Sequence, residues 1–146
     1  MIYKSENDGI DHINIYSKGQ TELGRWLSNF AFSPIETKDG HFNSIEGYWY
    51  WLISNNVEKE KLREVFGWNA KDLGRKLTTA DYDFSKEFSD KIKEAISIKL
   101  QSNIIMLKIL KESILPFAHY YVYGTKIVQP KNCEWIIEHI ENIRKS

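Results

Sequence analysis

The chain lacks most of the side chains on which disulfide and metal chemistry depend. Cys133 is the only cysteine among 146 residues, so no intrachain disulfide or thiolate metal site can form. We interpret it as a reduced thiol packed near the last helix. The four histidines, His12, His41, His119 and His139, are scattered, and no His-x-x-x-His pair occurs. The sequence therefore gives little support to a zinc site.

Long apolar runs and an excess of one charge are also absent. The longest apolar run, Tyr48 to Ile53, is far too short for a membrane span. No N-terminal segment resembles a signal peptide, so we expect a cytoplasmic protein. Twenty Lys and Arg balance twenty Asp and Glu, which argues against non-specific coating of nucleic acid but leaves room for a local phosphate-binding face.

No glycine-rich nucleotide loop and no Gly-x-Ser-x-Gly elbow occurs in the sequence. The remaining chemistry is that of carboxylates, of arginine for anions and of aromatic rings for stacking. At 42% hydrophobic and 27% charged residues, the composition is that of a folded globule. Without repeats or linkers, residues 1–146 fit one domain, for which we predict an α+β, predominantly helical fold with about six helices.

The N-terminal third is predicted to be extended and rich in turns. Residues 13–16 alternate like a strand. The segments 32–36 and 40–42 flank an Asp39-Gly40 turn and predict an antiparallel hairpin, with Pro34 on an edge strand. A second small β-element is expected at Tyr120-Tyr123, with 127–128 as its partner.

Helical patterns dominate after residue 42. Ser44 is a good N-cap for the helix that follows it, with Glu46 in the first turn. Further helices are predicted over 57–66, over 70–77 with an interruption at Gly74, from about Asp83 or Ser85, over 103–114, and from about Asn132. The apolar stripes of these helices are interpreted as core.

The segment from Ser44 to Trp51 carries the strongest functional signal. It places the Glu46 carboxylate beside four consecutive aromatic residues. A carboxylate next to apolar rings loses hydration, so its pKa can rise toward the range useful for acid–base chemistry. The segment is compatible with one wall of a nucleoside pocket. Taken alone, however, it fits a core helix with one solvated glutamate better.

Three other segments contain candidate ligand-binding groups. Asn29 follows Arg25-Trp26 in a loop, where its amide suits a hydroxyl or amide ligand as well as its own backbone. Gly74-Arg75 pairs a guanidinium with a residue that lets a phosphate approach the backbone, or is simply a surface arginine beside a weak helix position. Tyr120 to Gly124 contains three tyrosines, which are typical of a packed strand.

The order of these segments resembles that of the NADAR family, also called YbiA-like, over roughly Ile13 to Arg144. Six features of the sequence carry the resemblance: Leu27-Ser28-Asn29-Phe30, the Pro34-Ile35 hairpin, Phe42-Asn43-Ser44-Ile45-Glu46 followed by aromatics, Gly74-Arg75, Ala95-Ile96-Ser97-Ile98-Lys99-Leu100, and Tyr123-Gly124 in place of Trp-Gly. The chain departs from the family at three positions. Ile53 replaces a lysine, Phe84 a tryptophan, and Tyr120 an aspartate.

The resemblance implies an N-glycosidase that cleaves the bond between ribose C1′ and a nitrogen. The family is linked to ADP-ribose on guanine in DNA and to a phosphorylated ribosylamino-pyrimidine of the riboflavin pathway. Both reactions pass through a cationic sugar, which a nearby carboxylate stabilises. We expect ADP-ribose on guanine in DNA as the substrate, the riboflavin intermediate as the alternative, and no metal or organic cofactor.

The resemblance also assigns roles to residues. Glu46 is expected to act as the catalytic carboxylate, and His119 or a tyrosine to protonate the leaving nitrogen. The substrate-binding candidates are Asn29, Tyr48, Trp49, Arg75, Phe84, Tyr120, Tyr123 and Gly124. A DNA substrate further predicts a local basic rim, for which the candidates are Lys71, Arg75, Lys76 and Lys126.

Two readings without catalysis stay open. Because family residues are replaced at Ile53 and Tyr120, the protein fits a non-catalytic reader of ADP-ribose or nucleotides. An interaction protein with an ordinary aromatic core explains the ordered motifs least well. The oligomeric state is not predicted.

Overall fold

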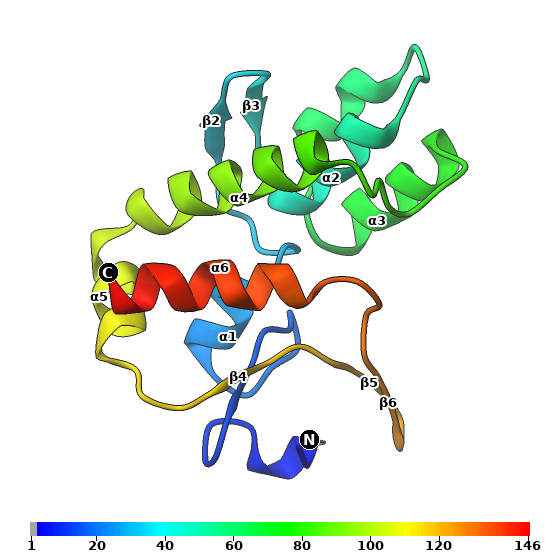
Figure 1. Cartoon of the computed structure of the whole chain (residues 1–146). Helices are drawn as coiled ribbons and strands as arrows, with labels where there is room; N and C mark the ends of the chain where they lie inside the picture. Colours follow the sequence, from blue (N-terminus) through cyan, green and yellow to red (C-terminus); the bar gives the residue numbers. More distant parts are fainter. Residues whose placement is uncertain (1–2) are drawn as a thin grey trace. The chain divides into compact units, whose positions relative to one another are not determined.

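The computed structural model describes residues 3–146, and in this part the chain forms six α-helices and three two-stranded sheets (Figure 1). The chain packs as two compact units. Unit 1 combines the N-terminal part up to Ser28 with Ile104–Ser146, and unit 2 consists of Asn29–Asn103. The single domain predicted from the sequence stays a prediction, and each unit is described by itself.

Unit 1 contains three helices and two sheets. Its helices are α1 (Glu22–Leu27), α5 (Ile104–Glu112) and α6 (Glu134–Lys145). Strands β1 (Ile13–Asn14) and β4 (Phe117–Ala118) pair in parallel, whereas β5 (Tyr121–Tyr123) and β6 (Lys126–Val128) form an antiparallel hairpin. A 3₁₀-helix, Ser5–Asn7, precedes β1.

The β1–β4 pairing continues through a side chain. The carboxamide of Asn14 donates to the carbonyl of Tyr120 and accepts from its N–H, both at 2.9 Å. The two bonds resemble the pair of N–H···O=C bonds that residues of neighbouring strands make with each other. The buried asparagine side chain therefore continues the hydrogen bonding of β1 and β4 beyond their last backbone bond. Asn14 thereby fixes the chain just before β5.

Unit 2 is built from a hairpin and three α-helices. Strands β2 (Ile35–Thr37) and β3 (Gly40–Phe42) are antiparallel around the Asp39-Gly40 turn, where Gly40 adopts a positive φ of 107°. The helices are α2 (Ile45–Ile53), α3 (Gly67–Leu77) and α4 (Lys86–Gln101), with a 3₁₀-helix Lys59–Arg63 between α2 and α3.

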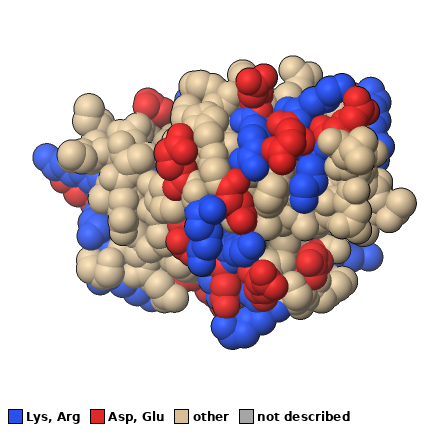
Figure 2. Space-filling model, turned by 90° about the horizontal axis from the view of Figure 1, so that it is seen from above, with Lys and Arg blue, Asp and Glu red and all other residues tan. Residues whose placement is uncertain are grey.

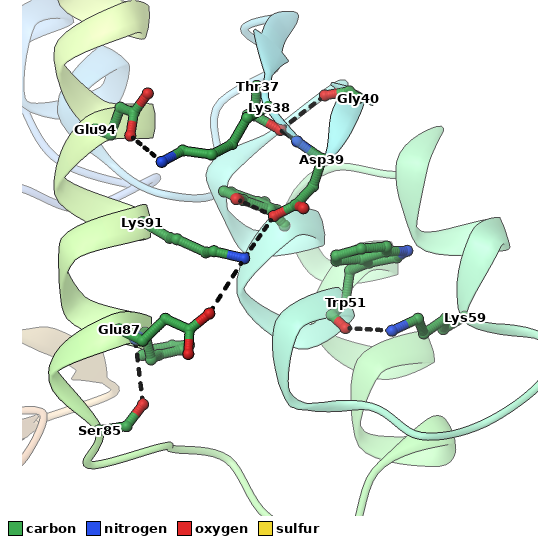
Figure 3. Close-up of polar contacts among 12 residues, drawn as sticks. Thr37, Lys38, Asp39, Gly40, Trp51, Lys59, Ser85, Glu87, Lys91 and Glu94 are labelled. Atoms are coloured by element: carbon green, nitrogen blue, oxygen red, sulfur yellow. Dashed lines mark hydrogen bonds and ion pairs between the residues drawn. The ribbon is translucent and has the colours of Figure 1, made fainter.

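The core of unit 2 holds the aromatic face of α2. Tyr48 is buried against Phe42, with ring centroids 4.6 Å apart, and its hydroxyl donates to Asp39 at 2.7 Å. Burial alone would raise the pKa of Asp39, but the hydrogen bonds from Tyr48 and Lys91 outweigh it and lower that pKa. Figure 3 shows Lys91 of α4 between Asp39 and Glu87, at 3.1 and 3.6 Å. The hairpin is thus tied to both α2 and α4.

Most of the predicted elements are present, with three corrections. The segment 57–66, predicted as a helix, contains only the 3₁₀-helix Lys59–Arg63. Helix α3 runs uninterrupted through Gly74 and starts earlier than expected. The N-terminal third, expected to be extended, contains α1, whose Thr21 side chain accepts from the Gly24 N–H at 2.9 Å. None of the helices in residues 3–146 has the length and apolar character needed to cross a membrane.

Candidate functional site

Glu46 lies in the first turn of α2, in a position fixed by its neighbours. Ser44 caps the helix by accepting from the Gly47 N–H at 3.0 Å, as predicted. The Glu46 N–H donates to the carbonyl of Asn29 at 2.9 Å. A backbone bond therefore joins the loop residue Asn29 to Glu46. The Asn29 carboxamide makes no hydrogen bond to any residue between 3 and 146, so it is available to a ligand.

The carboxyl of Glu46 has a strongly shifted proton affinity. Its pKa is raised to about 7, chiefly by burial and to a smaller extent by the charge of Asp81, while Lys71 and Arg75 partly offset the rise. Burial has the largest effect because it removes water from the charged form. Near neutral pH, both the acid and the carboxylate are populated. This pKa is typical of groups that exchange protons in catalysis.

Helix α3 supplies the cations that act on Glu46. Lys71 and Arg75 are four residues apart, so they lie on the same face of the helix. Between them, Gly74 is buried against Tyr50, and a Cβ at this position would lie 2.2 Å from the Tyr50 Cγ. A glycine is therefore required for α3 to approach α2. The expectation that Gly74 opens the backbone to a phosphate is wrong, because the Tyr50 ring covers it.

Asp81 connects Tyr50 and Arg75 after α3 ends. It accepts from the Tyr50 hydroxyl at 3.0 Å and lies 3.6 Å from the Arg75 Nε. Burial, the Glu46 charge and the bond to Asp81 all raise the pKa of Tyr50. The tyrosine is consequently a neutral hydrogen-bond donor, and the carboxylate of Asp81 orients the exposed guanidinium. We call Glu46, Tyr50, Lys71, Arg75 and Asp81 the Glu46 site.

The other aromatic candidates of unit 2 are placed differently from one another. Tyr48 and Trp49 are buried, and the Trp49 Nε1 donates to the Asp81 carbonyl at 2.8 Å. Neither ring offers an open face for a base. Phe84 is 77% exposed, with its ring 4.6 Å from that of Tyr82. It is accessible to a stacking ligand.

Four predicted site residues belong to unit 1. His119 packs its ring edge-on against Tyr121, and burial lowers its pKa to about 4. Tyr120 is buried, and its hydroxyl lies 2.6 Å from the Nε2 of His12. Tyr123 is exposed at the end of β5, and Gly124 forms the hairpin turn with φ 62°. At neutral pH His119 is therefore an uncharged imidazole.

Unit 1 also contains a hollow of about 350 Å³ that sequence reasoning missed. Asp8 and Asn14 are buried in its lining. The two carboxylate oxygens of Asp8 accept from the backbone N–H groups of Asn14 and Gln20 at 2.9 and 2.8 Å. No sequence motif marks this hollow, because its walls meet only after β1 pairs with β4.

The charges of the predicted basic rim are largely balanced. Lys76 pairs with Asp72 at 3.0 Å, and Arg75 lies close to Asp81. Figure 2 shows Lys and Arg side chains alternating with Asp and Glu on the face in view. Lys126 belongs to β6 in unit 1. Among residues 3–146, no three His, Cys, Asp or Glu side chains cluster as metal ligands would.

Sequence reasoning identified Glu46 and Arg75 but not the whole Glu46 site. Tyr50 and Asp81 were missed, and Lys71 was considered only as a rim residue. One signal was available, because Tyr50 follows Glu46 by four residues and Arg75 follows Lys71 by four, which places each pair on one helical face.

Lys99 of α4 is a further buried ionisable residue of unit 2. It lies in a segment that resembles the family, and burial lowers its pKa to about 7.

Comparison with known proteins supports the fold. The NMR structure of the E. coli protein YbiA matches with a TM-score of 0.65 at 18% sequence identity, over 99% of this chain and 92% of YbiA. No family model and no curated protein matches the chain. The fold is therefore YbiA-like, as predicted. Membership of the NADAR family is part of the proposal below.

Proposed function

We propose that this protein is a NADAR-type N-glycosidase that hydrolyses a ribose C1′–N bond, with ADP-ribose on a nucleobase, guanine in DNA, as its substrate. The observation that carries the proposal is the Glu46 carboxyl, whose pKa is raised to about 7 mainly by burial although the charges of Lys71 and Arg75 act to lower it. The YbiA-like fold and the ordered motifs of the sequence support it.

The reaction needs negative charge close to the sugar. As the C1′–N bond breaks, its electron pair leaves with the nitrogen and positive charge develops on the ribose. The Glu46 carboxylate stabilises this charge and takes a proton from the attacking water, whose oxygen bonds to C1′. The leaving nitrogen gains a proton, so the products are free ADP-ribose and the intact base. Lys71 and Arg75 favour the ionised form of Glu46, which this role requires.

The same cations suit the diphosphate of the substrate. A guanidinium binds phosphate oxygens through two parallel hydrogen bonds, and Asp81 holds the Arg75 guanidinium in one orientation. The carboxamide of Asn29 is available for a ribose hydroxyl. His119 is uncharged at neutral pH and is therefore a weak proton source. We assign protonation of the leaving base to solvent.

A second candidate is an N-glycosidase acting on a phosphorylated ribosylamino-pyrimidine of the riboflavin pathway. The alternating charges seen in Figure 2 favour it, because a long polyanion binds best to a continuous basic surface. The chemistry at Glu46 is the same for both substrates. The two substrates differ in the leaving base and in the phosphate groups attached to the ribose.

The test compares wild type with Glu46→Gln on both substrates, an ADP-ribosylated oligonucleotide and the pyrimidine intermediate, incubated side by side. Glutamine keeps the shape of the side chain but removes the negative charge, so we expect a rate loss of about 100-fold or more. Glu64→Gln, the same change at an exposed position of unit 2, is the control and should keep full activity.

The pattern of results decides between the readings. Cleavage of only the pyrimidine by wild type replaces the first substrate with the second. Wild type that binds ADP-ribosylated nucleoside without cleaving it is a reader, and the enzyme proposal fails. A Glu46→Gln variant that retains activity within a few-fold of wild type removes Glu46 from the mechanism.

A further inference from the structure

Helix α5 of unit 1 presents apolar side chains on two opposite sides. Met106 and Leu110 are buried, and they attach the helix to its own unit. Ile104, Ile105 and Ile109 lie outside the core, with 81%, 74% and 41% of their surface exposed. We call these three residues the isoleucine face. The interpretation of the apolar stripes as core is therefore correct for only one side of α5.

The isoleucine face is a continuous strip along the helix. Because successive residues of an α-helix are rotated by about 100°, the three isoleucines and the charged Lys108 and Glu112 all project within an arc of about 140°. The Nζ of Lys108 lies 4.0 Å from the Oε1 of Glu112, and both side chains are mostly exposed. The strip is thus apolar, with one charge of each sign.

Isoleucine is unfavourable at a helix position that faces water. Its branched Cβ restricts the side chain in a helix, so it favours helix formation less than leucine, lysine or glutamate. Helix α5 has only nine residues and needs tertiary packing to form. Within the chain this packing comes from the buried side and from α6, which lies beside α5 (Figure 1). Three exposed isoleucines add nothing to it, which indicates a surface that another molecule covers.

The size of the face fits a second copy of the same chain. Together with the stems of Lys108 and Glu112, the isoleucines expose on the order of 500 Å², which is the size of patch that marks interaction sites on soluble proteins. Two copies that cover each other's face remove about 1,000 Å² from water, the lower limit for a specific interface. The resulting dimer is expected to be weak and to depend on concentration.

The two charges of the strip are self-complementary under a twofold axis. An axis perpendicular to α5 packs the two helices antiparallel, which places Lys108 beside Glu112 of the partner subunit and Glu112 beside the partner subunit's Lys108. Within one helix, a lysine four residues before a glutamate is the less stabilising order of such a pair. The arrangement therefore favours pairing between antiparallel copies. An anionic membrane or a nucleic acid would instead require an excess of cations around the apolar strip.

We propose that the isoleucine face is a dimer interface at which two copies of this chain pack α5 against α5 in antiparallel orientation. Each copy contributes the same residues, so the contact is closed and produces dimers, not filaments. The proposal does not depend on the proposed function, because no residue of the Glu46 site belongs to unit 1. Glu46→Gln should accordingly dimerise like wild type.

Sedimentation equilibrium of the full chain, from about one to several hundred micromolar, measures the association. Wild type should pass from monomer to dimer within this range. Ile105→Ala should weaken the dimer about 10-fold or more, because the substitution removes apolar contact in both copies. Ile105→Glu should leave a monomer, because it brings two like charges together. Ile10→Ala is the control, since it removes an exposed isoleucine of unit 1 that lies outside α5, and the dimer should persist unchanged.

Charge reversal gives a second test that a defect in folding cannot imitate. Lys108→Glu produces a strip with two acids and Glu112→Lys a strip with two lysines, so each variant alone should associate about 10-fold or more weakly than wild type. A mixture of the two variants should form a heterodimer with an affinity within a few-fold of the wild-type dimer, because opposite charges then meet at both positions.

Three results would each overturn the proposal. They are a wild type that stays monomeric at the highest concentration, an Ile105→Glu variant that still dimerises, and charge-reversed variants that fail to associate when mixed. A monomeric wild type that sediments with vesicles of anionic phospholipid would overturn it in favour of a membrane surface.

Discussion

Glu46→Gln is expected to stabilise the protein even as it lowers the activity. The pKa of a glutamate carboxyl in water is 4.5, and that of Glu46 in the folded protein is about 7. Because the folded pKa is raised, the folded state binds the proton more tightly, and stability is lost as the pH rises from 4.5 through 7. A shift of roughly 2.5 units corresponds to about 3 kcal/mol. Glutamine, which is never charged, does not incur this loss.

The assay is thermal or urea unfolding of wild type and variant between pH 4 and pH 8. At pH 4 the two curves should give similar free energies of unfolding. At pH 8 the free energy of unfolding of the variant should exceed that of wild type by up to about 3 kcal/mol, which corresponds to roughly 6–12 °C in Tm for a chain of this size. Glu64→Gln should follow wild type at every pH. Parallel pH curves for wild type and Glu46→Gln would refute the burial argument and, with it, the shifted carboxyl on which the site depends.

Two further changes test the packing around this site. Gly74→Ala should lower the free energy of unfolding by about 1–3 kcal/mol in a urea melt, because the new methyl meets the Tyr50 ring; helix propensity alone predicts a gain of up to about 1 kcal/mol. Asp39→Asn should cost about 1–2 kcal/mol at pH 7 by removing the charged partner of Lys91 and Tyr48. The Asp39 pKa is lowered on folding, so this cost should shrink as the pH falls below about 3.9.

Gly74→Ala has a matched control, and each of the two changes has an outcome that would contradict it. Asn69→Ala introduces alanine at an exposed position of α3 and should change stability by about 0.5 kcal/mol or less. A Gly74→Ala variant as stable as wild type would mean that α2 and α3 are less closely packed than described. For Asp39→Asn, a cost that persists unchanged into acid would assign the effect to lost packing instead of lost charge.

Local signals in the sequence predicted the parts of the fold that local interactions determine. The Ser44 cap marks the start of α2, and Asp39-Gly40 marks the hairpin turn. The pairing of β1 with β4 was not predicted, because each strand is only two residues long and the two strands are far apart in the sequence. The 3₁₀-helix Lys59–Arg63 was overpredicted as an α-helix, since charged pairs spaced three apart suit both helix types.

The candidate site shows the same limit. Glu46 was found because its neighbours in sequence are unusual, and a pKa near 7 followed from burial among them. The rotation of α2 about its own axis decides which tyrosine lies near Glu46, and contacts with α3, such as that of Tyr50 with Gly74, set this rotation. Tyr48 was selected from the sequence as a substrate-binding residue, but its hydroxyl donates to Asp39. Rotation about a helix axis is a tertiary property that a local pattern does not contain.

The carbonyl groups of Asn29 and Phe30 have a consequence for how this chain tolerates change. The Asn29 carbonyl accepts from the N–H of Glu46, and the Phe30 carbonyl accepts from the N–H of Gly67. Two adjoining peptide units therefore hold two residues that are 21 positions apart in the sequence. Inserting an amino acid between Asn29 and Phe30, or deleting one of the two, would shift the start of α2 relative to the start of α3. Loop-length variation is therefore tolerable on either side of this dipeptide but not within it.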